Sequence, residues 1–298
     1  MNHQGRLGRT DGSKGRVRIA ALLTMGLVTL LPGCVKLKWL MTVYPGGSGK
    51  VEIRLRVTKA GHAFSKFAPP GEPSGKTLKP ESIQAGSRGI VAWTETRESQ
   101  DDGETVWDFT GYFEDLSQVK ISMLCPRMKG WKSFDFRKQE DGSYELTFED
   151  DAIEEIGDHG KHFDRAKGEQ EKERVRQALR MSYADLEFEY TFRLPGEVEH
   201  ADDMEIEGRN ARLAVDADWL IEKMEKGVID DEYVAQITSR PEEDIADEFS
   251  AFEKEMKEAR KAWDKRKKAD APPEKKGEKD GRDGDEEGPG SKGSGSER

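Results

Sequence analysis

Residues 36–57 read KLKWLMTVYPGGSGKVEIRLRV, and this stretch decides the fold. Its second half alternates charged residues with Val51, Ile53, Leu55 and Val57. A period of two is typical of a strand with one buried and one solvated face. Pro45 and the glycines after it supply a turn between two such strands. The stretch therefore predicts an antiparallel hairpin of residues 36–44 and 50–57.

The same alternation recurs along the chain. It predicts strand pairs or single strands at residues 89–95 with 104–113, 133–138 with 143–149, 186–194, and 204–207 with 211–215. One charged helix over residues 161–181, with sparse apolar positions, is expected to lie on the surface. A short helix capped by Asp216 follows. The expected fold class is α+β: an antiparallel sheet built from hairpins with one surface helix inserted, followed by C-terminal helices and a disordered tail.

Composition divides the chain into four parts. Residues 1–33 form an export signal, and residues 34–226 form the antiparallel α+β domain. Residues 227–268 are expected to be an amphipathic helical segment. Residues 269–298 contain no large apolar side chain, so this polar tail is expected to be disordered.

The last helix is expected to run from Pro241, a residue favoured in a first helical turn, to residue 268. Spacings of four and three residues alternate between Ile245, Phe249, Phe252, Met256, Ala259 and Trp263. This spacing is the apolar seam of a heptad repeat. Packing of the seam on the helix's own domain is the favoured interpretation, because Phe, Met and Trp suit irregular globular surfaces. The alternative is self-association or insertion into the groove of a protein partner.

The N-terminus predicts export and lipid anchoring. A basic region of 18 residues precedes IAALLTMGLVTLL, thirteen uncharged residues at positions 19–31. This run is too short to span a bilayer and is typical of a signal peptide. Residues 31–34, LPGC, resemble the bacterial lipobox, in which the cysteine thiol accepts diacylglycerol and acyl chains such as palmitate. We expect cleavage before Cys34 and anchoring in the cell envelope, facing the periplasm or the exterior. Val35 in place of Asp favours the outer membrane where one is present.

Charge and motifs exclude several function classes. The chain has a net charge of −11, and removal of the export signal, which carries +4, leaves −15. Such a surface repels phosphate backbones, so no nucleic-acid partner is expected. His159 and His162 lack further ligands at a recognisable spacing, so they predict a solvated loop and no metal site. No nucleophile elbow, dinucleotide motif or phosphate loop is present in the sequence, which favours a protein without enzymatic activity or cofactors.

The order of several features resembles the bacterial lipoproteins of the LppM type, over about residues 34–215. The carrying features are the lipobox Cys34, the hairpin at 35–57, the FEDL turn at 113–116, the hairpin at 134–149 and FRLPG at 192–196. The sequence departs from the family at 210–215, where a Trp is missing, and in its polar tail, where many relatives have a transmembrane helix. The resemblance implies a small envelope domain that holds a lipid-like ligand, and it implies no catalytic residues.

Aromatic residues at alternating strand positions have two interpretations. They are Trp107, Phe109, Phe134, Phe136, Tyr190 and Phe192. Aromatic side chains on one sheet face commonly fill a core, but the same side chains can line an apolar pocket for a lipid tail. The sequence thus favours a non-enzymatic envelope protein that binds an amphiphile. The alternatives are a protein-interaction module acting through residues 241–268 and, less favoured, an enzyme.

Substitution of Cys34 tests the anchor. Cys34→Ser removes the thiol that accepts the lipid, so the variant should incorporate no labelled fatty acid and should accumulate as the unprocessed precursor. The measurement is metabolic labelling with radioactive palmitate in the native host. Cys125→Ser is the matched control, which should be labelled normally. Normal labelling of Cys34→Ser would contradict lipidation at this residue.

Overall fold

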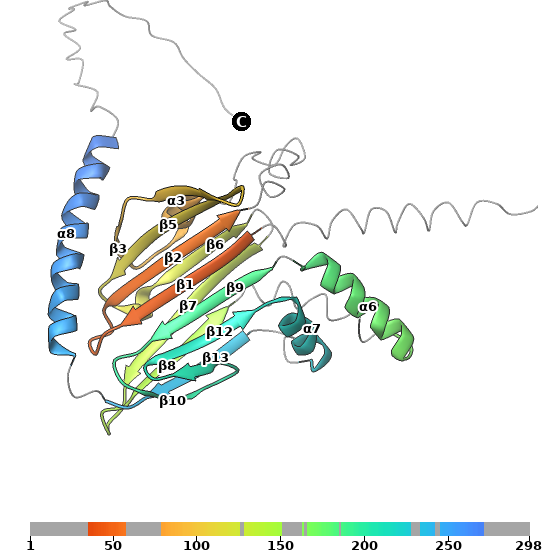
Figure 1. The fold of residues 1–298 in the computed structure, drawn as a ribbon. Helices are drawn as coiled ribbons and strands as arrows, with labels where there is room; N and C mark the ends of the chain where they lie inside the picture. The colour runs from red at the N-terminus through yellow and green to blue at the C-terminus, as the bar shows by residue number, and fades with distance from the viewer. Residues whose placement is uncertain are drawn as a thin grey trace, which may run out of the picture.

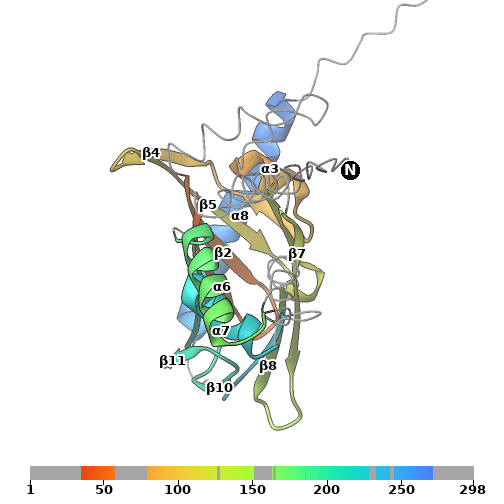
Figure 2. The ribbon, with the colours of Figure 1, turned by 90° about the vertical axis from the view of Figure 1, so that its right-hand side faces the viewer.

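The computed structural model describes residues 35–57, 79–125, 128–150, 163, 166–184, 186–227, 233–241 and 245–270. Their strands form two β-sheets that pack face to face, with the larger sheet in front in Figure 1 and both layers visible in Figure 2. The helices lie outside this sandwich. They are α3 (Pro80–Gly86), the 3-10 helix η3 (Leu116–Gln118), α6 (Glu169–Ser182), α7 (Ala217–Glu225) and α8 (Ala246–Asp270).

The larger sheet has eight strands. Seven follow the order β11 (Glu205–Glu207), β12 (Asn210–Val215), β9 (Glu187–Arg193), β1 (Val35–Val43), β2 (Gly49–Val57), β5 (Glu104–Phe113) and β3 (Ile90–Trp93), while β4 (Arg97–Asp101) also pairs with β5. The smaller sheet has five strands, in the order β10 (Val198–Ala201), β13 (Tyr233–Ser239), β8 (Tyr144–Asp150), β7 (Met128–Lys138) and β6 (Lys120–Cys125).

The hairpin of β1 and β2 forms as predicted. Val35 pairs with Val57 at its open end and Val43 with Gly49 at its turn. Gly47 adopts a positive φ of 79°, which a side chain would disfavour. At Gly49 a Cβ atom would lie 2.1 Å from the carbonyl oxygen of Thr42, so only glycine fits there. The turn chemistry and the alternation therefore act together to set the register of the hairpin.

The other predicted hairpins also form, but β1 and β9 pair in parallel, from Lys36 opposite Glu187 to Thr42 opposite Arg193. Parallel neighbours need a long crossover connection. Here the chain between β2 and β9 passes through β5, the smaller sheet and α6. The expected α+β class, with an antiparallel sheet and an inserted surface helix, is confirmed. The parallel pair lies in the middle of the larger sheet, where it joins β9, β12 and β11 to β1, β2, β5 and β3.

The structure differs from the sequence interpretation after residue 226. The sequence predicts a helical segment at 227–268, yet Tyr233–Ser239 forms β13, which lies between β10 and β8. Tyr233, Ala235 and Ile237 alternate with more exposed residues and are buried in the sandwich. The helical prediction is wrong for this part. Residues 233–239 instead form backbone hydrogen bonds with β8, on the side of β8 that β7 leaves unpaired. The last helix accordingly begins at Ala246, five residues after Pro241.

Helix α8 packs on its own domain through the predicted seam. Phe252 is 2% exposed and stacks on Tyr44, with ring centroids 4.4 Å apart, and also lies against Tyr112. Phe249, Met256 and other seam residues pack on the same cluster, which includes Ala92 of β3. The helix therefore covers the outer face of the larger sheet where β1 and β5 end. The favoured interpretation of the seam agrees with this packing.

Truncation of Phe252 tests this contact. Phe252→Ala should lower the free energy of unfolding by about 3–4 kcal/mol, because it removes a buried ring between two tyrosines. Lys261→Ala, on the exposed side of the same helix, is the matched control and should change stability by less than about 0.5 kcal/mol. Urea denaturation of both variants measures the difference. Equal stability of the two variants would show that α8 contributes nothing to the fold.

Candidate functional site

The aromatic residues predicted to line a ligand pocket lie between the two sheets. Five of the six are buried, and Phe136 is partly buried and stacks on Tyr144. The ring centroids of Phe134 and Phe192 are 6.5 Å apart, and both rings contact Phe148. Rings at these separations touch, as in a packed core. The structure thus brings these residues together as the interior of the sandwich.

A buried ion pair lies in the same interior. Lys132 of β7 and Asp150 of β8 are direct cross-strand partners, and their side chains are 1% and 0% exposed. The Lys132 ammonium bonds to Asp150 and lies 4.6 Å from the ring centre of Tyr190. Burial, and next the charge of Asp150, raise the pKa of Tyr190 well above its usual value. Aromatic rings and the Asp150 carboxylate therefore surround the Lys132 ammonium in the interior of the sandwich.

The sequence interpretation missed this pair, although a signal for it was present. Lys132 is two residues from Phe134 on β7, and Asp150 is two residues from Phe148 on β8. Residues two apart in a strand lie on the same face, so both side chains point inward. A charged residue at an inward position predicts a buried partner. Because neither side chain reaches solvent, we assign the pair a structural role in holding β7 against β8.

Unpairing these charges should destabilise the fold strongly. Lys132→Met alone leaves Asp150 buried without its cation, which should cost about 3–5 kcal/mol of unfolding free energy. The double variant Lys132→Met/Asp150→Leu removes both charges and should recover most of that loss. Urea denaturation measures the unfolding free energy of both variants. Both carry Lys132→Met, so the packing lost at residue 132 is the same in the two. A double variant as unstable as the single one would contradict a paired-charge origin.

The outer face of the larger sheet carries a groove of about 1520 Å³. Its floor is formed by β1, β2, β5, β9 and β12, and it is bounded by residues of β11 on one side and by Glu255 of α8 on the other. Because the apolar residues of these strands face the sandwich interior, their polar residues face the groove. Figure 1 shows this face toward the viewer, with α8 along one end.

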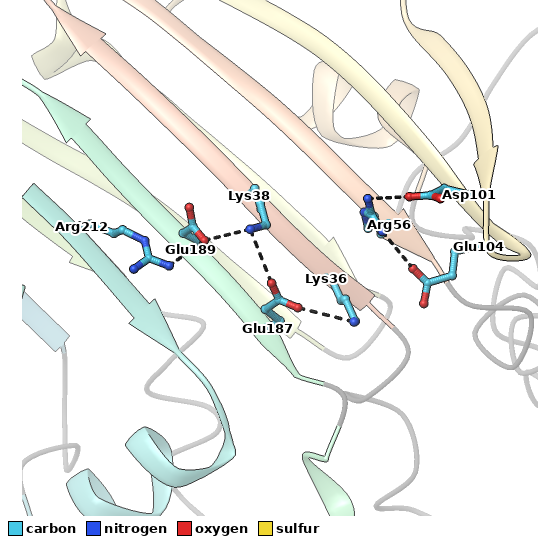
Figure 3. Close-up of polar contacts among 8 residues, drawn as sticks. All are labelled: Lys36, Lys38, Arg56, Asp101, Glu104, Glu187, Glu189 and Arg212. Carbon is cyan, nitrogen blue, oxygen red and sulfur yellow. Dashed lines mark hydrogen bonds and ion pairs between the residues drawn. The ribbon is translucent and has the colours of Figure 1, made fainter. Parts of the chain in front are cut away.

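Ion pairs cross the groove from strand to strand. Lys38 lies 3.0 Å from Glu189 and 3.6 Å from Glu187, and Arg212 bonds to Glu189 at 3.0 Å (Figure 3). Arg212 also bonds to Glu205 of β11 at 3.0 Å. The Arg212 hydrogen bond, with a contribution from Lys38, holds the pKa of Glu189 below its usual value. These ion pairs link the side chains of three neighbouring strands, β1, β9 and β12.

A second group of ion pairs joins the first hairpin to β5 and its turn. Arg54 makes two bonds to Asp108, at 2.7 and 3.2 Å, and Arg56 lies 2.8 Å from Asp101 and 3.7 Å from Glu104. Arg56 and its two partners appear at the opposite side of Figure 3 from Arg212. Of these residues, Arg54 and Asp108 line the groove, so this wall presents one paired cation and carboxylate.

The end of the groove at α8 also holds polar groups that bond to one another. The Tyr112 hydroxyl donates to Glu255 at 2.7 Å, and Lys50 lies 3.3 Å from the same carboxylate. Burial, followed by this hydrogen bond, raises the pKa of Tyr112. Leu40 and Thr191 also line the floor. Such a surface can hydrogen-bond a hydroxyl-rich or zwitterionic group and offers little area to an acyl chain.

Other expected sites are only partly within the described residues. Cys34, the export signal, His159 and His162 lie outside them. Among the described residues no group of three or more His, Cys, Asp or Glu side chains is placed to hold a metal ion. In the same part of the chain, no helix has the length and apolar character needed to cross a membrane.

Comparison with known proteins gives a weak likeness. No protein-family model and no curated protein matches the chain. A solved structure, the folded domain of LppM from Mycobacterium tuberculosis determined by NMR, is similar over 72% of this chain and 93% of that chain. The sequence identity is 11% and the TM-score is 0.35.

Proposed function

We propose that this protein is a lipid-anchored protein of the cell envelope that binds the polar part of an amphiphile without catalysing a reaction. The anchoring rests on the basic region, the thirteen-residue apolar run and the LPGC motif at 31–34. Two or more acyl chains on Cys34 give durable attachment to a bilayer. The first strand begins at Val35, so the domain would follow the anchor directly.

The groove on the outer face of the larger sheet is the observation that carries the binding proposal. It has a volume of about 1520 Å³ and is open to solvent along the face of the sheet. The aromatic interior is occupied by contacting rings, so the sandwich interior is a poor site for an acyl chain. We therefore assign the headgroup to the groove and leave the tail in the membrane.

A protein-interaction module is the second candidate. The observation in its favour is the amphipathic helix α8, which resembles a helix that binds in a groove. Its seam, however, is covered by Tyr44, Tyr112 and Ala92 of its own domain. A protein partner that binds the seam would first have to displace these contacts, whereas a ligand of the groove would not. We therefore favour the ligand-binding proposal.

Blocking the groove tests the proposal. Thr191→Trp places a large ring on the groove floor, and it should reduce the amphiphile retained by envelope-purified protein at least about tenfold. The measurement is native mass spectrometry followed by lipid extraction.

Thr147→Trp is the matched control, because Thr147 has the same outward position on a central strand of the smaller sheet. It should retain the ligand at the level of the unmodified chain. If no preparation carries an extractable amphiphile, or if both variants carry equal amounts, the groove is not the binding site.

A further inference from the structure

The exposed face of α8 carries a row of lysines. Spacings of three, four, four and three residues separate Lys254, Lys257, Lys261, Lys265 and Lys268. With 3.6 residues per turn, this spacing places the five side chains in one stripe, on the side of the helix opposite Phe252 and Met256. All five are exposed. We call them the lysine stripe.

The stripe is unusual for this chain. Successive members are three or four residues apart, so each lysine neighbours another like charge, an arrangement that destabilises a helix. Glu258 and Asp264 flank the stripe, yet no stripe lysine forms an ion pair with another described residue. Residues 254–268 hold eight basic and three acidic side chains, a local charge of +5 in a chain of −11.

The charges on the sheet face behave differently. Lys38, Arg54, Arg56 and Arg212 all bond to carboxylates of neighbouring strands. A solvated helix could have used its acids in the same way, but the acids of α8 that form ion pairs, Glu248 and Glu255, bond to the sheet and its neighbouring turn. Among the described residues, the stripe is therefore left without an ion-pair partner.

We propose that the lysine stripe is a docking surface for an extended anionic polysaccharide of the envelope. The stripe spans fifteen residues, which is roughly 21 Å along the helix axis. Lysine ammonium groups are compact, hydrated charges on flexible stems, so they respond to charge density more than to a particular geometry. A polymer with a negative charge on each repeating unit matches this linear array.

The stripe lacks the features of a protein-binding surface. Protein interfaces are centred on aromatic or arginine residues in desolvated pockets. The aromatic residues of α8, Phe249, Phe252 and Trp263, pack on the domain side of the helix. Small or polar side chains such as Ala262 lie beside the lysines. Charge without an apolar centre favours a flexible polymer over a folded partner.

The position of α8 also disfavours the anchoring membrane as the occupant, an argument that rests on the proposed function. Phe252 stacks on Tyr44, which follows the end of β1, whereas the anchor precedes the beginning of β1. The nine residues of β1 extend over roughly 26 Å. In Figure 1, α8 stands at the end of the larger sheet that is far from the beginning of β1.

Matched lysine variants test the proposal. The probe is polygalacturonate, a polysaccharide with one carboxylate on each sugar, titrated against the chain from residue 34 onward with Cys34→Ser, which contains every described element. Lys257→Gln/Lys261→Gln/Lys265→Gln should weaken binding at least about tenfold and reduce the slope of log affinity against log salt by roughly two. Lys120→Gln/Lys138→Gln/Lys167→Gln changes the net charge equally on other exposed lysines, and it should stay within about twofold of the unmodified chain.

Circular dichroism should give the same melting curve for both triple variants, because all six lysines are exposed. Equal loss of binding in the two variants, or no binding to polygalacturonate, would overturn the proposal. Tighter binding to polyglutamate or to phosphatidylglycerol vesicles would also overturn it, in favour of an acidic protein or a membrane. Thr191→Trp should bind polygalacturonate normally, so failure of the groove and failure of the stripe are separate results.

Discussion

Contact between the aromatic rings of the two sheets is the interaction on which the rest of the structure depends. Trp39 and Tyr190 from the larger sheet meet Phe134 and Phe148 from the smaller one, with centroids 5.5–5.8 Å apart. These rings surround the buried Lys132, whose charge is paired with that of Asp150. Because the rings occupy the interior, the candidate ligand site is the groove on the outer face of the larger sheet.

The outer face follows from the same alternation that builds the core. Each strand that sends an apolar residue inward sends a polar residue outward, so the larger sheet acquires a surface of cross-strand ion pairs. Exposed pairs of this kind add little stability individually. Their arrangement across β12, β9 and β1 nevertheless agrees with only one strand order, since Glu189 meets both Lys38 and Arg212.

Helix α8 connects the two proposed binding surfaces. Its seam packs on Tyr44 and Tyr112, and Glu255 beside the seam forms one end of the groove. The lysine stripe occupies the opposite side. A heptad seam needs only a narrow band of the helix, so the remaining surface is available for charges of either sign. One helix can therefore close a groove for a headgroup and present cations to a polymer.

The sequence by itself determined which residues form most strands, which side of each strand is apolar, and where the helix seam lies, because periods of 2 and 3.5 are properties of the local chain. It also supplied the lipobox at Cys34, which remains a prediction. Only the tertiary structure decided that β1 pairs with β9, that Tyr233–Ser239 is a strand, and that Lys132 meets Asp150. The same holds for Trp107, Phe109, Phe134, Tyr190 and Phe192, which fill a core where the sequence also allowed a cavity. The physical reason is that a local period specifies the face on which a side chain lies, whereas the group opposite that face comes from residues far away in the chain.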